Sequence, residues 1–462
     1  MTYFFYAKIK FYVWNTFMIK HLDIFSSFIS QTRFSDIPAD TVSRAKLIIA
    51  DCVGAIVGGS AEPEILAFTD SIKSSGTSRI LGSSNLTDPQ TASLINGTAG
   101  TVLEMDEGHQ FARGHPGMHV FPALLAATES TTGSVSGKDF LTAFIVGYDI
   151  AARIGLATSL NANMHPHGTW GVIGAAAALG ALNRLDEVKL AELLNIASSL
   201  TLATSRKTML EGGTVRNAYT GVANQMSHMA HKLLMAGFTG EADGIGSVFG
   251  GVVSSGFDVE AALESIGKRF EVNRNYFKLH ACCRYNHAAL DALWILLDKH
   301  PELQSPDQID HINIESYFLA AELDDQKPRN MLAARFSIPF AIATTLINRS
   351  SKVHSFTGNT LTDPATLALA AKTSISESSF MSAQLPDFRP AEVSITMKNG
   401  QNFKAGVKTN RGDWQDPYNN AQLKEKYMSL TARRWSDKTS NAVYQNISSL
   451  DRFSNVTMAF DG

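Results

Sequence analysis

The densest group of side chains that could transfer protons lies in the segment 103–119, LEMDEGHQFARGHPGMH. Carboxylates and imidazoles stand side by side there, which is what general acid–base catalysis requires. The glycines and the proline predict a loop, and a loop can hold side chains toward a cleft. A solvated loop with surface histidines is the alternative interpretation. The cluster comprises Glu104, Asp106, Glu107, His109, Arg113, His115 and His119.

A second pair of histidines, His165 and His167, precedes a glycine-rich helix in MHPHGTW (164–170). A helix N-terminus attracts anions and lowers the pKa of a nearby imidazole, so His165 is a candidate for touching a substrate carboxylate or transferring a proton. A capping turn explains the same pattern without any function. Tyr148 in GYDIAARIG (147–155) is a further candidate proton donor, with packing as its alternative role.

Basic side chains gather in SRKTMLEGGTVRN (205–217), where Arg206, Lys207 and Arg216 surround a Gly-Gly turn. Guanidinium and ammonium groups hold carboxylates through charge-assisted hydrogen bonds, so these three residues are candidate anchors for an acidic substrate. A solvated basic loop is the alternative.

The segment YFKLHACCRYNH (276–287) brings cations and thiols together. Lys278 and Arg284 are its candidate polar groups, whereas the adjacent Cys282 and Cys283 are expected to be buried packing residues at a helix start. The chain has one further cysteine, and three cysteines are too few for a disulfide framework or a four-thiolate zinc site. We therefore expect a reducing compartment, the cytoplasm.

The sequence does not favour a metal site. His115 and His119 would share a face only if the segment between them were helical, and Pro116 and Gly117 argue against that helix. The chain also has no G-x-S-x-G elbow, no Walker loop and no dinucleotide-binding glycine pattern. We expect neither a metal nor an organic cofactor.

Composition places these clusters in a globular chain of 462 residues. A net charge of −3 excludes a nucleic-acid binder that works by bulk charge, and a hydrophobic fraction of 44% is typical of a compact protein of two or three domains. Residues 1–17 are rich in aromatic residues, but Lys8 and Lys10 interrupt the apolar run. Because neither a signal peptide nor a membrane span fits, we interpret residues 1–17 as an extension outside the fold and expect no membrane association.

The helices that must position the clusters fill the first half of the chain, which is rich in Ala, Leu, Ile and Gly between helical start and stop signals. GVIGAAAALGAL (171–182) has small residues on several faces and predicts a central helix that is buried all round. Helices are expected at 41–57, 91–105, 119–131, 137–159, 169–183, 186–205 and 217–236.

Strand signals begin after about residue 270. QIDHINIESYF (308–318) is rich in β-branched residues, and AEVSITMKNGQNFKAGVKT (391–409) alternates on both sides of Asn399-Gly400. An Asn-Gly pair between alternating runs is the strongest short-range signal for a hairpin. Helical patterns are present at 286–299, 335–348 and 416–460.

The order of these patterns predicts a mainly α protein. Its large all-helical domain is expected to combine residues 18–274 with the C-terminal residues 411–462. Residues 275–410 are expected to form a smaller α+β lid domain inserted between those two parts.

The clusters and their order resemble the MmgE/PrpD family, whose members dehydrate, decarboxylate or epimerise small polycarboxylates. The resemblance covers most of residues 20–430. The matching pieces are DCVGAIVGG (51–59), NGTAGTVLEMDEGH with HPG (96–117), GYDIAARIG (147–155), HPHGTWGVIGAAAA (165–178), FKLHACCRYNH (277–287), RFSIPFAIA (335–343), and DP followed by LKEKY (416–427).

The resemblance implies a homodimer in which the active site lies in the cleft between a large helical domain and a smaller α+β lid. It also implies catalysis without a metal or an organic cofactor. By motif match, His115, His165 and Lys278 fall at active-site positions of the family, and Glu104 and Asp106 fall in its acidic segment.

Several positions depart from the decarboxylase members of the family. Those members carry an aspartate at Glu104, a threonine near Gly108, a lysine in the segment that reads MLEGG (209–213) and a tyrosine at Phe340. The loss of these groups argues against cis-aconitate decarboxylation by this chain. Arg216 is a candidate to replace the charge of the missing lysine.

We therefore expect a hydro-lyase of small hydroxy-polycarboxylates, which moves a proton at a carbon next to a carboxylate and expels water. An epimerase that returns the proton to the opposite face, and an inactive carboxylate-binding member of the family, are the alternatives. The expected acid–base residues are His115 and His165, with Lys278 as a charge stabiliser or second base. The other expected catalytic residues are Asp106, Glu104 and Tyr148, and the expected substrate-binding residues are Arg206, Lys207, Arg216, His109 and Arg284.

Overall fold

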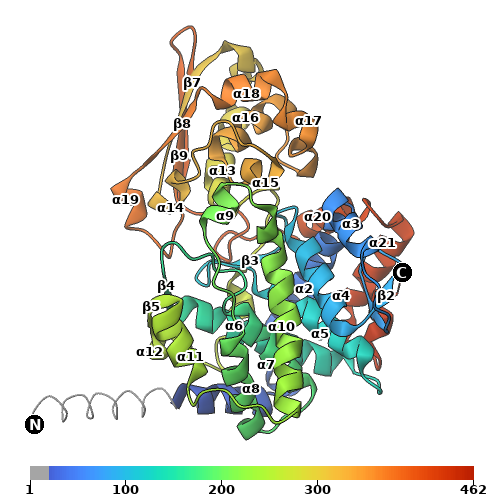
Figure 1. Ribbon diagram of the computed structural model, residues 1–462. Coiled ribbons are helices and arrows are strands. Elements are labelled where there is room, and N and C mark those ends of the chain that lie inside the picture. Colours follow the sequence, from blue (N-terminus) through green and yellow to red (C-terminus); the bar gives the residue numbers. More distant parts are fainter. Residues whose placement is uncertain (1–19, 462) are drawn as a thin grey trace, which may run out of the picture.

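The computed structural model describes residues 20–461 as a mainly helical molecule (Figure 1). The expected extension 1–17 lies outside the described residues. A first helix covers 20–31. The helices of the larger, helical part are α2 (Ala39–Gly59), α3 (Pro63–Asp70), α4 (Pro89–Thr101), α5 (Pro116–Ser130), α6 (Gly137–Ala157), α7 (Gly171–Leu182), α8 (Glu187–Ser199), α9 (Lys207–Leu210), α10 (Ala218–Met235), α11 (Gly244–Ser247) and α12 (Val259–Leu263).

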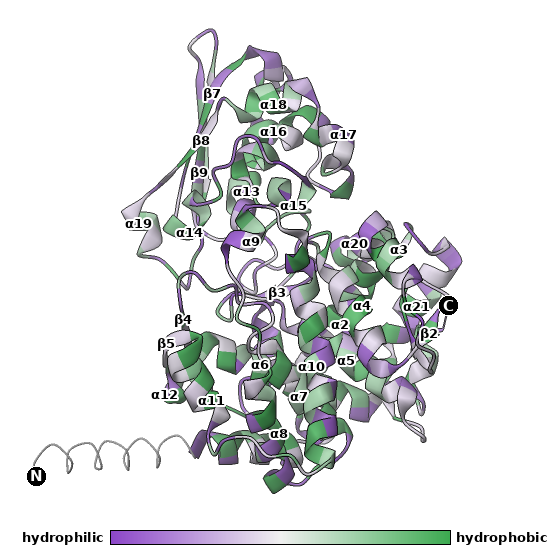
Figure 2. Ribbon diagram, viewed as in Figure 1, coloured by the Kyte–Doolittle hydropathy of each residue, from purple (hydrophilic) through white to green (hydrophobic). Residues whose placement is uncertain are grey.

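Helix α7 lies at the centre of the helical part and packs against α5, α6, α8 and α10. It is buried along almost its whole length, as its small residues predict, and Figure 2 shows that α6 and α7 carry mostly hydrophobic residues. Glycines let α6 and α7 approach closely. A Cβ atom on Gly174 would lie 2.4 Å from Cβ of Ala151, and one on Gly147 would lie 2.7 Å from Cβ of Ala178.

Helix α6 is long and apolar enough to cross a membrane by length and composition alone. However, 89% of that apolar window is buried inside the fold. Its two central charges pair with each other, because Asp149 and Arg153 lie one turn apart and form an ion pair. The helix therefore serves as a core element of this fold.

The ends of three helices differ from the sequence expectation. Helix α4 ends at Thr101 and α8 at Ser199, so both are shorter than predicted, and the freed residues form loops around the polar clusters. Helix α5 begins at Pro116, three residues before the predicted start. The expectation that Pro116 and Gly117 prevent a helix there is wrong, because proline is well suited to the first helical turn, where its missing N–H has no helical partner.

The α+β part contains a four-stranded sheet with the order β10-β9-β7-β8. Its strands are β7 (Ile309–Ser316), β8 (Thr373–Glu377), β9 (Ala391–Met397) and β10 (Asn402–Val407). The hairpin predicted at Asn399-Gly400 is confirmed, with β9 and β10 antiparallel. Strand β8 pairs in parallel with β7 and was not predicted, because its short sequence TSISE is mostly exposed and lacks an apolar alternation.

Helices cover this sheet and lead to the site. The larger ones, α13 (His287–Lys299) and α16 (Ile338–Asn348), contact the strands. Figure 1 shows the sheet at one end of the molecule, with α13, α15 and α16 on one side of its strands. The shorter helices are α14 (Phe318–Ala321), α15 (Met331–Arg335), α17 (Gly358–Leu361), α18 (Pro364–Ala370) and α19 (Ser379–Ser382).

The chain then returns to the helical part, where α20 (Asn420–Thr431) and α21 (Asp437–Ser448) pack against α2. In Figure 1 these red helices lie beside the blue helices α2, α3 and α4. The predicted mainly α fold class is confirmed. The domain boundaries and the movement of the α+β part as a lid stay predictions.

Three pairs of short strands complete the fold. They are β1 (Ser78–Arg79) with β2 (Leu86–Thr87), β3 (Gly108–His109) with β6 (Asn275–Tyr276), and β4 (Thr158–Leu160) with β5 (Ser254–Phe257). The pairing of β3 with β6 matters for the site, because it joins the acidic loop after α4 to the segment that leads into the α+β part.

Candidate active site

Two acidic side chains of the loop after α4 converge on one lysine. Nζ of Lys278 lies 3.3 Å from Oε2 of Glu104 and 3.4 Å from Oδ1 of Asp106, and Arg216 forms an ion pair with Oε1 of Glu104. All four side chains are at most 2% exposed. Two carboxylates and two cations thus balance their charges in a water-poor site, where electrostatic forces are stronger than in solvent.

The pairing of β3 with β6 builds this meeting point. Gly108 of β3 lies opposite Tyr276 of β6, so Lys278 follows two residues later beside the acidic loop. Glu104 adopts a left-handed φ of 54°. A residue with a side chain holds that conformation only where the surrounding structure imposes it, and such positions cluster at functional sites.

His115 immediately precedes α5 and is oriented by Asp106. Its Nδ1 lies 3.0 Å from Oδ2 of Asp106 and also contacts the carbonyl oxygen of Glu107. Burial raises the pKa of Asp106, but the nearby His115 and Lys278 outweigh burial and hold that pKa below its usual range. The charged carboxylate therefore fixes the imidazole, as the acidic partner of a histidine base does.

His165 lies beside Arg216 in the loop before α7. Its Nδ1 accepts a hydrogen bond from the backbone N–H of His167 at 3.0 Å, and its Nε2 accepts one from Nε of Arg216 at 3.4 Å. Burial, reinforced by the charge of Arg216, lowers the pKa of His165 well below its usual range. Both ring nitrogens therefore face donors, and a neutral imidazole can accept from only one of them at a time. This geometry suits a positioning role beside Arg216 better than that of a base.

The ring of His167 lies among the other histidines. Its centroid is 4.7 Å from that of His115, 4.6 Å from His165 and 5.5 Å from His119. His119 uses both nitrogens, since Nδ1 donates to the carbonyl of His115 and Nε2 accepts from the N–H of Gly168. Burial lowers the pKa of His119 to about 4. His119 therefore supports the loop as a neutral ring.

Glu107 extends the network behind His115. Its carboxyl group accepts hydrogen bonds from the backbone N–H of Gly117 at 2.7 Å and from the hydroxyl of Tyr148 at 3.0 Å. Burial and the nearby Asp51 raise the pKa of Glu107 to about 8. Tyr148 is fully buried and its hydroxyl is engaged by Glu107, so the geometry favours a positioning role for it over that of a proton donor to substrate.

Two of the expected substrate-binding residues lie in structural networks. Nε2 of His109 pairs with Glu271 at 3.0 Å, and its Nδ1 accepts a hydrogen bond from the N–H of Ala112. Arg284 pairs with Asp413 at 2.6 Å. Since these groups already have protein partners, the structure does not present His109 and Arg284 as free anchors.

The three basic residues of segment 205–217 also differ in whether they reach the buried cluster. Arg206 reaches across to the α+β part and pairs with Glu322 at 2.7 Å. Lys207, the first residue of α9, is exposed and forms no ion pair with any residue in 20–461. Of the three basic candidates in this segment, Arg216 is the one that reaches the buried cluster.

Sequence reasoning missed two residues at the site. His167 was noticed but given no role, although its spacing two residues from His165 in an extended turn was a usable signal, because alternate residues there face the same side. Tyr276 was quoted in its segment but not singled out. A lone tyrosine carries no motif, and its position became visible only through the pairing of β3 with β6.

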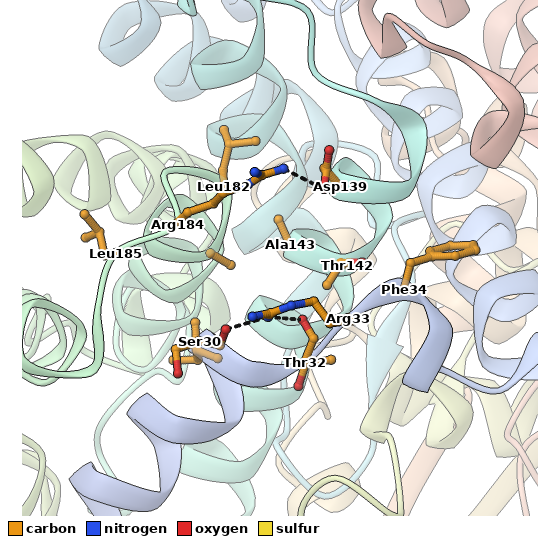
Figure 3. A pocket seen from close by; sticks show the side chains of 12 residues that line it. Ser30, Thr32, Arg33, Phe34, Asp139, Thr142, Ala143, Leu182, Arg184 and Leu185 are labelled. Carbon is orange, nitrogen blue, oxygen red and sulfur yellow. Dashed lines mark hydrogen bonds and ion pairs between the residues drawn. The ribbon is translucent and has the colours of Figure 1, made fainter.

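A surface hollow of about 360 Å³ opens at the opposite end of α7 from these histidines. Figure 3 shows its charged side chains already engaged with protein groups: Arg184 pairs with Asp139 at 3.5 Å, and Arg33 donates to the carbonyl oxygens of Ser30 and Thr32. Its lining contains no histidine. The buried acid–base cluster is therefore the stronger candidate for chemistry. Within residues 20–461, no three His, Cys, Asp or Glu side chains form a group that could hold a metal ion.

Comparisons with known proteins cover both halves of the chain. The MmgE/PrpD N-terminal domain matches residues 23–259, and the MmgE/PrpD C-terminal domain matches residues 280–450. Among curated relatives, the cis-aconitate decarboxylase of Aspergillus terreus is 24% identical over 450 residues, which cover 91% of each chain. The human cis-aconitate decarboxylase is 24% identical over 428 residues, covering 89% of this chain and 87% of the relative.

Proposed function

The chain belongs to the MmgE/PrpD family, and on that premise we propose that it is a lyase acting on a small polycarboxylate. The finer proposal is a hydro-lyase that removes water from a hydroxy-polycarboxylate. The observation that carries it is the pair of His115 and Asp106, which leaves one imidazole nitrogen able to accept a proton inside a cluster of cations. The relatives named as decarboxylases support lyase chemistry in general.

The first step is removal of a proton from a carbon next to a carboxylate by Nε2 of His115. Such a proton is weakly acidic, so the negative charge that develops must be stabilised at the same time. Lys278 lies next to the acids that orient His115 and supplies that positive charge. Arg216, whose Nε donates to Nε2 of His165, carries a planar fork of N–H groups, which suits the recognition of a substrate carboxylate.

Decarboxylation is the second candidate, and the similarity to cis-aconitate decarboxylases favours it. Two residues of this chain argue against decarboxylation. Phe340 is fully buried on α16, packs near Phe356 at 6.2 Å between ring centroids, and offers no hydroxyl group. Gly108 likewise has no side chain to donate a hydrogen bond. Epimerisation is a third candidate, because one base and one acid on opposite faces of the carbon would suffice for it.

The α+β part is proposed to act as a lid. The cluster is sealed, with His115 only 6% exposed, so a substrate needs a path that opens. Contacts that join the α+β part to the loops around the cluster include Arg206 with Glu322 at 2.7 Å, Asn330 with the carbonyl of Gly212 at 2.8 Å, and Arg389 with the carbonyl of Gln110 at 2.6 Å. Breaking these contacts would let the α+β part move away from the site.

We also propose that the protein works as a cytoplasmic homodimer without a cofactor, and that it binds neither nucleic acid nor membrane. The family resemblance supports the dimer, and the net charge of −3 supports the absence of a nucleic-acid partner. Three free, buried cysteines suit a reducing compartment. Light scattering tests the dimer, since a mass of one chain would contradict it.

Proton NMR in D2O with citrate-, malate- and aspartate-like acids separates the candidate reactions. Loss of a C–H signal with growth of a vinyl signal and no release of CO2 supports the hydro-lyase. Deuterium uptake without an alkene indicates the epimerase, and CO2 release from cis-aconitate indicates the decarboxylase. Ligand-induced thermal stabilisation without any of these changes indicates a carboxylate-binding protein.

A further inference from the structure

Tyr276 carries a hydroxyl group for which the structure supplies no partner. The residue is 4% exposed, yet its hydroxyl forms no hydrogen bond with any residue in 20–461. Because its oxygen is not among the fully buried, unpartnered atoms of residues 20–461, a water-sized molecule can reach it, and it is open to a partner that enters the site. Because the residue lies beside the acid–base cluster, a substrate would be that partner.

The position of this hydroxyl depends on Gly108. A Cβ atom added to Gly108 would lie 2.3 Å from Oη of Tyr276 and 2.4 Å from Cζ of the same ring. A residue with a side chain at 108 would therefore displace the phenol. The absence of a Cβ lets the tyrosine ring lie directly over the acidic loop, in the space that a side chain at 108 would occupy.

The surroundings of the ring are those of the proposed site. Its centroid lies 6.4 Å from that of His115 in an edge-on arrangement, and the guanidinium of Arg284 lies over its face at 4.5 Å. Lys278 follows two residues later on the same segment. The phenol is thus placed between the proposed base, the proposed charge stabiliser and a further cation.

We propose that Tyr276 is a catalytic residue, the general acid that protonates the leaving hydroxyl in the dehydration. The inference rests on the proposed hydro-lyase function. His115 removes the proton from carbon, the C–H electrons form the double bond, and the C–O bond breaks as the oxygen takes the proton of Tyr276. Alkene and water leave, and the proton held by His115 returns to the tyrosinate through water, which restores both residues.

The other hydroxyl and imidazole groups are less suited to this step. The hydroxyl of Tyr148 donates to Glu107, and Nε2 of His165 accepts from Nε of Arg216, so neither group is free to donate to the leaving oxygen. Burial raises the pKa of the Tyr276 phenol, so the group keeps its proton at neutral pH and is available as a donor. Nearby Lys278 favours the tyrosinate that forms during the step.

The test compares Tyr276→Phe with the wild-type protein on two substrates that differ in their leaving group. One is the hydroxy acid that the wild type dehydrates, and the other is its analogue with chlorine in place of the hydroxyl. Chloride leaves without a proton, whereas hydroxide needs one. We expect Tyr276→Phe to form alkene from the hydroxy acid about 10²- to 10⁴-fold more slowly, but to eliminate chloride at close to the wild-type rate.

Tyr427→Phe is the matched control. Tyr427 is a buried tyrosine on α20 whose hydroxyl also has no hydrogen-bond partner among the described residues, and its ring packs against Tyr444 at 5.1 Å. It should keep both activities. Gly108→Ala should reproduce the loss seen in Tyr276→Phe, while Gly133→Ala, where a Cβ meets nothing within 4 Å, should change neither.

The possible outcomes distinguish a wrong role for Tyr276 from a wrong hydro-lyase function. Equal loss on both substrates would assign Tyr276 a structural role, and undiminished dehydration would show that it donates no proton; either result overturns the inference while the hydro-lyase stands. A wild-type protein that forms no alkene from any acid of the panel overturns the proposed function and the inference together.

Discussion

Nδ1 of His115 and Oδ2 of Asp106 lie 3.0 Å apart, and this contact, together with the hydrogen bond between Nδ1 and the carbonyl oxygen of Glu107, decides which nitrogen of the imidazole can accept a proton. The carboxylate and the carbonyl of Glu107 both only accept hydrogen bonds, so Nδ1 must carry the hydrogen. Nε2 then keeps its lone pair. The acidic loop thereby converts an ordinary histidine into an oriented base next to two cations.

Asp106→Asn is expected to lower kcat by about 10²- to 10⁴-fold with a smaller change in KM. The amide of asparagine can offer an N–H to Nδ1, which favours the tautomer with hydrogen on Nε2 and removes the base. Steady-state kinetics measure the effect. Asp139→Asn, at the exposed pair with Arg184, is the control that should keep full activity. A kcat within threefold of wild type in Asp106→Asn would refute the orienting role.

Arg216→Lys is expected to raise KM about 10- to 100-fold, because a lysine keeps the charge but loses the planar fork that binds a carboxylate. The ion pair with Glu104 retains one cation in this variant, which limits the loss of stability. Lys207→Gln is the control and should leave KM unchanged. If Lys207→Gln raised KM and Arg216→Lys did not, the carboxylate anchor would lie on α9.

The pH dependence of stability should carry a contribution from Glu107. Its pKa is raised from an ordinary value of 4.5 to about 8, so the folded state keeps a proton that the unfolded state releases. This stabilising contribution is complete below pH 4.5 and is lost as the pH rises through 8. Glu107→Gln keeps a neutral side chain at all pH values, so the variant should not show this loss of stability as the pH rises.

Denaturant unfolding of wild type and Glu107→Gln at several pH values measures that difference. The free energy of unfolding of the wild type, relative to the variant, should fall as the pH rises from 5 to 8. Taking the difference cancels the opposing contributions of buried histidines such as His119 and His228, whose pKa values are lowered to about 4. Parallel curves would mean that Glu107 is already ionised in the fold.

Glu322→Gln is expected to loosen the cover of the site by removing the ion pair with Arg206. Pairs of this partly exposed kind contribute modestly, so amide hydrogen exchange in 205–213 and 330–333 should accelerate by about two- to fivefold. Mass spectrometry of the exchanged protein measures it. Glu392→Gln, which breaks a pair with Lys404 on the sheet, should leave these segments unchanged. Unaltered protection from amide exchange in Glu322→Gln would show that the Arg206–Glu322 pair does not hold the α+β part over the site.

Much of the fold follows from local pattern in the sequence. The helix at 171–182 is apolar on every face, and Asn399-Gly400 stands between two alternating runs, so each element is specified by its own residues. Strand β8 could not be found in this way, because it is polar and short and depends on pairing with β7. The start of α5 was misjudged because a proline inside a helix and a proline in its first turn have opposite effects.

The site was less predictable than the fold. His115, Glu104 and Asp106 share one loop, and their spacing in the sequence already placed them together. Arg206 and Arg216 have the same charge in the same segment, yet one pairs with Glu322 on the surface and the other reaches the buried cluster. Tertiary contacts decide such outcomes, and no local pattern distinguishes the two arginines.

The most direct test of the central claim follows proton removal from carbon in wild type and His115→Gln. Each protein is incubated in D2O with the acid that wild type converts, and proton NMR records the C–H and vinyl signals over time. If His115 is the base, both the loss of the C–H signal and the growth of the vinyl signal slow by about 10²- to 10⁴-fold in the variant. C–H loss at the wild-type rate in His115→Gln would contradict that role, because another group would then be the base.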